Sequence, residues 1–106
     1  MKKLYTVKTP RAFDDIIKNG SCMKNRYFVV HSNNNDLPYD RFGISVSKKL
    51  GNAVFRNKYK RKIRSIIDNY KKVYVNSKDY IIILRKEAIN LSHQELENEL
   101  IALLKK

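Results

Sequence analysis

The sequence predicts an α+β fold, a small two-layer sandwich in which a sheet of about four strands packs with three helices. Runs of β-branched and aromatic residues, which favour strands, alternate with segments whose apolar residues recur every three or four positions. The expected order is α-β-β-β-α-β-α, with one strand placed where residues 21–32 bend. A length of 106 residues, 42% of them hydrophobic, fits one domain with its own core. We therefore treat residues 1–106 as a single domain.

The first helix is predicted within the segment TPRAFDDIIKNG, residues 9–20. Thr9 is a good N-cap and Pro10 suits the first helical position, whereas Gly20 ends the helix. The spacing of its apolar residues gives the helix one hydrophobic face, made of Phe13, Ile16 and Ile17.

Strands are predicted at three further places. The segment YFVVH, residues 27–31, is β-branched and aromatic, and residues 31–40 form a loop. Residues 41–47 alternate between apolar and polar side chains, as a strand with one buried face does. The segment DYIIILR, residues 79–85, is apolar on both faces, which is typical of a central strand covered on two sides.

Two longer helices follow from the remaining pattern. Residues 52–70 begin at the N-cap Asn52 and carry an apolar stripe formed by Tyr59, Ile63, Ile66, Ile67 and Tyr70. The C-terminal segment starts with a capping box made of Ser92 and Glu95, which predicts a helix from that point.

The positive charge of the chain indicates a polyanionic partner. Lys and Arg total 23 against 10 Asp and Glu, a net charge of +13, which costs stability through self-repulsion. Nucleic acid is the first candidate. An anionic membrane surface is the second, but membrane-binding basic helices favour Trp, Phe or Leu on the opposite face, and the chain has no Trp. We therefore expect no membrane partner.

The basic residues concentrate in residues 41–64, which hold nine Lys or Arg and no Asp or Glu. At about 100° per residue, the cations of the helix lie away from its apolar stripe. A solvated helix face is the alternative interpretation, but such faces normally mix the two signs of charge. Phosphate groups are the expected target of this surface, because Arg and Lys bind them readily. RNA fits better than DNA because no helix-turn-helix, zinc-finger or zipper pattern occurs.

Other classes of function lack support in the sequence. The single cysteine, Cys22, allows no intramolecular disulfide, and no signal peptide or membrane span is found, so we expect a cytoplasmic protein. His31 and His93 are isolated, and no G-x-S-x-G, P-loop or H-E-x-x-H motif occurs. We expect no catalytic residue and no metal site in the chain itself.

The run VSKKLGNAVFRNKYKRKIR, residues 46–64, closely resembles the signature of the bacterial ribonuclease P protein subunit, V-S-K-K-x-G-N-A-V-x-R-N-x-x-K-R-x-x-R. The resemblance extends over essentially the whole chain. It implies a ribonucleoprotein that removes the 5′ leader of precursor tRNA, in which an RNA subunit performs the Mg²⁺-dependent hydrolysis. The protein then binds that RNA and the leader and needs no other protein partner. The resemblance also implies a left-handed β-α-β crossover around the basic helix, although right-handed crossovers are nearly universal.

The resemblance assigns roles to individual residues. Those implied to face the catalytic RNA are Arg56, Asn57, Lys60, Arg61 and Arg64. Those implied to lie near the substrate are Ser47, Lys48, Lys49 and Asn52. A leader groove between the first helix and the sheet would contain Phe13, Ile17, Phe28 and His31, although Phe13 and Phe28 equally fit core positions. The family often has aromatic residues where this chain has Ile17 and His31.

Two other functions remain open on the sequence. One is a general RNA-binding module, ribosomal or chaperone-like, without a processing role. The other is a nuclease that acts without an RNA subunit.

Overall fold

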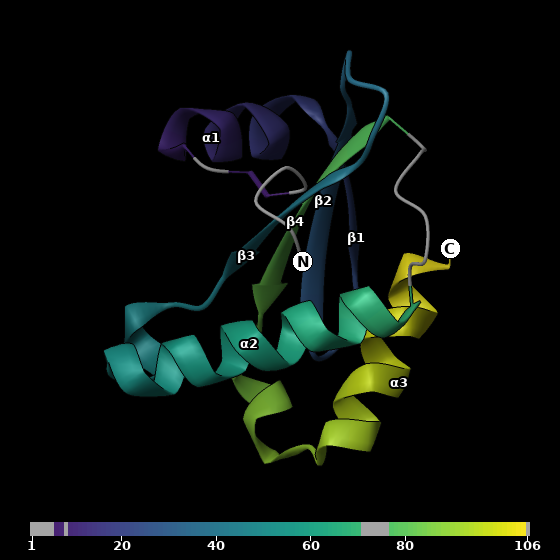
Figure 1. Ribbon diagram of the computed structural model, residues 1–106. Helices are drawn as coiled ribbons and strands as arrows, with labels where there is room; N and C mark the ends of the chain where they lie inside the picture. Colours follow the sequence, from purple (N-terminus) through teal and green to yellow (C-terminus); the bar gives the residue numbers. More distant parts are fainter. Residues whose placement is uncertain (1–5, 8, 71–76, 106) are drawn as a thin grey trace.

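The computed structural model describes residues 6–7, 9–70 and 77–105, and Figure 1 shows how their elements are arranged. Its elements are α1 (Pro10–Asn19), β1 (Ser21–Lys24), β2 (Phe28–Asn34), β3 (Arg41–Ser45), the 3₁₀ turn η2 (Lys48–Leu50), α2 (Ala53–Tyr70), β4 (Lys78–Leu84), the 3₁₀ turn η3 (Lys86–Asn90) and α3 (His93–Leu104). The predicted α+β class and the order α-β-β-β-α-β-α are confirmed. The two 3₁₀ turns were not predicted.

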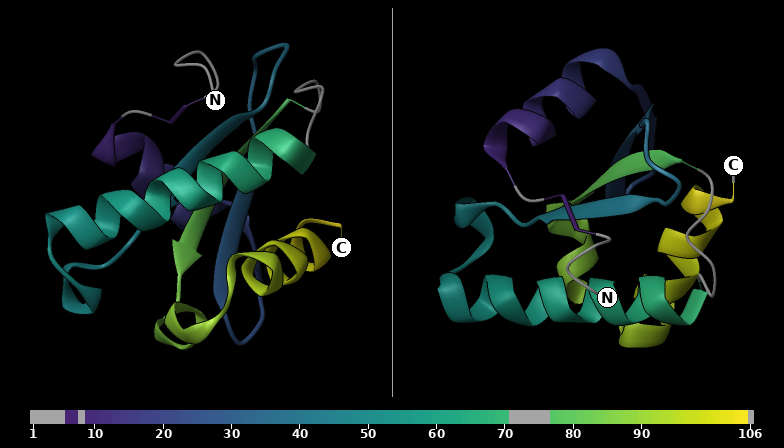
Figure 2. Two further views of the ribbon diagram at one scale, coloured as in Figure 1. Left: turned by 60° about the horizontal axis from the view of Figure 1, so that its bottom comes forward. Right: turned by 45° about the horizontal axis from the view of Figure 1, so that its top comes forward.

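The four strands form one mixed sheet in the order β1-β2-β4-β3. Strands β1 and β2, and β2 and β4, pair antiparallel, whereas β3 and β4 pair parallel with Ile44 opposite Ile82. Helix α2 connects the two parallel neighbours. In the left view of Figure 2, α2 lies in front of the sheet, both parallel strands run downward, and β4 lies to the right of β3. The crossover is therefore left-handed, as the family resemblance implies.

Helices cover both faces of the sheet, so the number of layers differs from the two predicted. The right view of Figure 2 shows α1 on one side of the sheet, and α2 and α3 on the other. Successive side chains of β4 alternate between the two sides: Ile81 packs with Val7 and Ile16, and Ile82 packs in the larger core. That core includes Phe28, Val30, Phe42, Ile63, Ile66, Ile67, Leu84, Leu96, Leu100 and Leu103. The central strand predicted to be covered on two sides is β4.

The helix starts follow the capping residues that the sequence predicted. Thr9 Oγ1 accepts a hydrogen bond of 3.1 Å from the backbone N–H of Ala12. Asn52 Oδ1 accepts one of 2.9 Å from the N–H of Phe55. Such bonds satisfy N–H groups that have no partner within the helix.

Strand β2 is longer than predicted, because it extends through Asn34 into the segment expected to be a loop. Asn is a poor strand former, but pairing with β4 continues to Asn34, opposite Lys78, and overrides the local preference. Strand β1 confirms the additional strand expected within residues 21–32.

A cluster of polar side chains holds the first residues of β3 and β4 in place. Arg41 donates to both carboxylate oxygens of Asp79, with Nε–Oδ1 at 2.9 Å and Nη2–Oδ2 at 2.6 Å. The hydrogen bond with Asp79 raises the pKa of Arg41 above its ordinary value. Asn35 Nδ2 also donates to Asp79, at 2.8 Å, and the buried Asp40 accepts from the N–H of Lys78 at 2.9 Å. Together these bonds tie the loop before β3 to the start of β4.

We expect Gly20→Ala to lower the free energy of unfolding by about 1–3 kcal/mol, the usual cost of overpacking. A Cβ at Gly20 would overlap the carbonyl oxygen of Ser32 on β2 and lie 2.6 Å from that of Ile16. Both are backbone atoms, so they cannot move aside as a flexible side chain can. Urea denaturation measures the change, and Ser21→Ala, at an exposed neighbouring position, is the control. Equal stability of the two variants would contradict the prediction.

We expect Glu95→Gln to be less stable than the wild type near neutral pH. This difference in stability should disappear in acid. Ser92 N–H donates to Glu95 Oε1 at 3.0 Å, and this bond lowers the pKa of Glu95. A carboxyl group with a lowered folded-state pKa stabilises the fold above its unfolded-state pKa and ceases to do so as pH falls through the folded-state value. Thermal unfolding between about pH 7 and pH 3 tests this, because carboxyl groups titrate in that range. A pH-independent difference from the wild type would contradict it.

Candidate nucleic-acid interface

Helix α2 has a core side and a cationic side, as its sequence predicted. Tyr59, Ile63, Ile66 and Ile67 are buried against the sheet and α3. On the outer side, the surface forms a hollow of about 470 Å³, which we call the α2 hollow. Its lining residues are Val54, Asn57, Lys60, Arg61 and Arg64. The described residues of this lining include three cations and no carboxylate, so the surface is suited to phosphate groups.

Four of the five residues predicted to face the catalytic RNA meet in the α2 hollow; Arg56 does not line it. The side chain of Arg56 is partly buried, and its Nε is buried without a hydrogen-bond partner among the described residues. Val54 also lines the hollow, although it was not predicted as a site residue, and its side chain is 76% exposed. Its match to the valine of the G-N-A-V segment in the family signature was a signal that could have identified it.

The residues before α2 form the turn η2, which presents Lys48 and Lys49 to solvent. Ser47 Oγ accepts a hydrogen bond of 3.2 Å from the N–H of Lys49, so Ser47 caps this turn. Asn52 caps α2 itself. The predicted substrate-side residues therefore lie together at one end of the basic helix.

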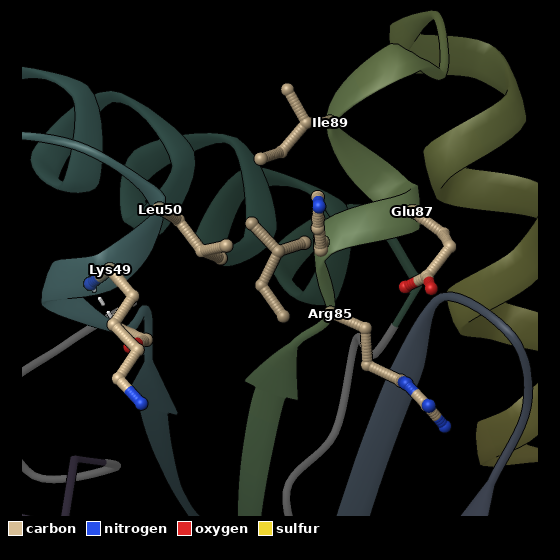
Figure 3. Close-up of a pocket in the computed structure, with 8 residues that line it drawn as sticks. Lys49, Leu50, Arg85, Glu87 and Ile89 are labelled. Atoms are coloured by element: carbon tan, nitrogen blue, oxygen red, sulfur yellow. Dashed lines mark hydrogen bonds between the residues drawn. The ribbon is translucent and has the colours of Figure 1, made fainter.

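A second hollow lies beyond the carboxyl ends of β3 and β4, and we call it the strand-end hollow. Figure 3 shows Lys49 and Arg85 on its two flanks, with Leu50 and Ile89 between them. It has a volume of about 590 Å³, and its full lining is Ser47, Lys49, Leu50, Leu84, Arg85, Lys86, Glu87 and Ile89. Arg85 and Lys86 were not predicted from the sequence as site residues. Their position directly after a buried strand was the available signal.

A third hollow separates α1 from β3 and α2, and we call it the α1 groove. Its volume is about 430 Å³, and its lining is Thr9, Pro10, Phe13, Asp14, Ile17, Ile44, Ser45, Val46 and Lys60. Phe13 packs directly over Gly43 of β3, where an added Cβ would lie 2.5 Å from Cζ of the ring. Ile17 is 40% exposed. Two of the four residues predicted for a leader groove, Phe13 and Ile17, thus line a groove.

The prediction for Phe28 is wrong, and His31 does not line the groove. Phe28 is fully buried in the core beneath α2 and α3, on the face of the sheet opposite α1. His31 lies opposite Ile81, which packs on the α1 side, so it shares the face of α1. It is half-buried on β2, away from the residues of the groove.

Within the ranges that the structure describes, no three His, Cys, Asp or Glu side chains gather as a metal site would require. No helix in those ranges is long and apolar enough to cross a membrane. The fold and its surface define a class: a small α+β protein with a basic crossover helix, whose exposed side is arranged for a polyanion.

Comparison with known proteins identifies the family within this class. The model of the protein family described as Ribonuclease P matches residues 1–106. The ribonuclease P protein component of Streptococcus pneumoniae (strain Hungary19A-6) is 46% identical over 105 residues, which cover 99% of this chain and 85% of the relative. The Staphylococcus aureus RNase P protein structure superposes with a TM-score of 0.88 at 43% identity, over 95% of this chain and 93% of that one. The Thermotoga maritima RNase P protein gives 0.86 at 35% identity, over 94% of each chain.

The chain belongs to the ribonuclease P protein family. The resemblance seen in residues 46–64 is therefore confirmed, and so is the predicted role in tRNA processing as the protein component of a ribonucleoprotein. The comparisons give no support to a general RNA-binding module without a processing role.

We expect Arg61→Ala to weaken RNA binding without a change in thermal stability. The side chain is exposed and lines the α2 hollow, so we expect its loss to remove a phosphate contact and no core packing. The slope of log affinity against log salt should fall by about 0.7–0.9, the value for one phosphate contact. Salt titrations of binding measure the slope. Lys105→Ala removes one exposed charge that does not line the hollow and is the matched control. A large drop in melting temperature for Arg61→Ala would contradict a contact role.

Proposed function

We propose that the chain binds the catalytic RNA of ribonuclease P through the α2 hollow and the 5′ leader of precursor tRNA in the α1 groove. The observation that carries this proposal is the adjacency of two hollows with different linings, which share Lys60. One lining is cationic, and the other combines an aromatic ring with aliphatic side chains. The first suits a folded RNA, whereas the second suits a single strand.

The α2 hollow suits the phosphate backbone of a folded RNA. Arg61 and Arg64 offer planar forks that form paired hydrogen bonds with phosphate oxygens, and Lys60 adds a compact charge. Asn57 contributes an amide that both donates and accepts hydrogen bonds. Such contacts read the shape of an RNA more than its sequence.

The α1 groove suits the bases of an unpaired strand. The ring of Phe13 offers a stacking surface, and Ile17 and Ile44 offer aliphatic contact. Stacking of a base on an aromatic ring contributes about 1–3 kcal/mol and accepts any base. Because Phe13 is the only aromatic residue among the described residues of the lining, we expect modest leader affinity with little sequence preference.

The strand-end hollow extends the basic surface from the start of α2. Lys49, Arg85 and Lys86 bring three cations to it, against one carboxylate from Glu87. We assign this surface to the phosphates of the substrate near the cleavage junction. This assignment retains the predicted substrate role of Lys49 and adds the two residues that follow β4.

We assign the hydrolysis and its Mg²⁺ to the RNA subunit, and we assign binding and positioning to this chain. The chain's contribution is to hold two RNA strands close together with cations between them, which offsets their mutual repulsion. We expect it to act without an obligatory protein partner and in the cytoplasm, because a single exposed Cys22 suits a reducing compartment.

A reconstituted cleavage assay tests the proposal. The RNA subunit is assayed at low Mg²⁺ with precursor tRNA, with and without the chain. We expect the chain to raise kcat/KM about tenfold or more for a long leader, because one stacked base alone is worth about 1–3 kcal/mol. A leader too short to reach the α1 groove is the control, and it should gain less. Equal rates with and without the chain would reject the proposal, and cleavage without any RNA subunit would indicate a protein-only nuclease.

A further inference from the structure

Among the residues that the structure describes, only Lys60 lines both the α2 hollow and the α1 groove. It lies on α2 and is partly buried between the two hollows. Among the residues described, no acidic side chain lies within salt-bridge distance of its ammonium group. Its charge is therefore not neutralised by a neighbouring carboxylate.

The charges that line the two hollows differ. In the α2 hollow, Lys60 is one of three cations. Among the described residues that line the α1 groove it is the only cation, and they also include the carboxylate of Asp14. An RNA strand in the groove therefore has one favourable charge contact from the lining, and that contact comes from a residue that also belongs to the RNA surface of α2.

Two RNA strands in adjacent hollows repel each other. Near a protein surface two unit charges 4 Å apart interact by about 4 kcal/mol, and salt screens this repulsion only beyond about 8–10 Å. A cation at the border attracts both strands and offsets this repulsion. Lysine suits that place, because its ammonium group has three donors on a flexible stem and can contact two phosphates.

We propose that Lys60 is a shared phosphate contact that couples the two binding events, so that the bound catalytic RNA favours binding of the leader and the leader favours the RNA. This inference rests on the proposed function, because it assigns one strand to each hollow. The coupling is reciprocal, as any equilibrium coupling between two sites must be. Lys60 acts here as a binding residue and takes no part in the chemistry.

The experiment measures a coupling factor. A labelled leader oligonucleotide is titrated with the chain alone and with the chain saturated with the RNA subunit, and the factor is the ratio of the two dissociation constants. We expect Lys60→Ala to lower this factor about tenfold, within the 5–150-fold range usual for coupled sites. Lys60→Arg keeps the positive charge that attracts both strands, so its factor should stay within about twofold of the wild type.

Two matched variants separate coupling from simple loss of binding. Arg64 lines the α2 hollow and not the α1 groove. Arg64→Ala should therefore weaken binding of the RNA subunit and leave the coupling factor unchanged. Ile17 lines the α1 groove and not the α2 hollow. Ile17→Ala should therefore weaken binding of the oligonucleotide by the same factor in both titrations.

The results distinguish a failure of the coupling by Lys60 from a failure of the proposed function. An unchanged factor in Lys60→Ala, or an equal fall in Arg64→Ala, overturns the coupling while leaving the proposed function standing. Failure of the wild-type chain to bind the RNA subunit or to stimulate cleavage overturns the proposed function itself, and that result is obtained before any variant is made.

Discussion

Strand β4 is the element on which the rest of the structure depends. It is hydrogen-bonded to β2 on one side and β3 on the other, and its two faces are covered by different helices. Ile81 packs on the α1 side and Ile82 on the side of α2 and α3, so one strand fixes the positions of both helical layers. At its start, Asp79 binds Arg41 and thereby fixes the position of β3 beside it. The α1 groove and the α2 hollow are both placed by this strand.

The parallel pairing of β3 and β4 explains where the cations lie. Two parallel neighbours need a connection that returns to the starting edge of the sheet, and α2 provides it across one face. The apolar stripe of α2 must then face the sheet, which leaves the Lys and Arg residues outside. The turn η2 and the residues after β4 meet at the carboxyl ends of the two strands, so Lys49 and Arg85 come together although they are far apart in sequence.

Features set by neighbouring residues were predictable, and features set by pairing between strands were not. The caps at Thr9, Asn52 and Ser92 are local, so the sequence was enough to locate the helix starts. The face on which Phe28 lies depends on its pairing with Leu84 of β4, and a shift of one residue would reverse it. Likewise, Arg85 enters the strand-end hollow only because the strand β4 ends beside η2. Phe13 and Ile17 on α1 line a groove, because the exposed face of a helix is set locally, whereas Phe28 on β2 is buried on the opposite face of the sheet.

The balance of energies in α2 explains how a helix with so many like charges can form a surface before RNA is bound. Like charges four residues apart destabilise a helix by about 0.2–0.5 kcal/mol per pair. Burying one isoleucine side chain stabilises the folded protein by about 1.5–3 kcal/mol. Ile63, Ile66 and Ile67 are all fully buried, so the core side of the helix outweighs the repulsion on its outer side. The cations are then held on a folded helix in the free protein, and RNA binding need not supply the free energy of ordering them.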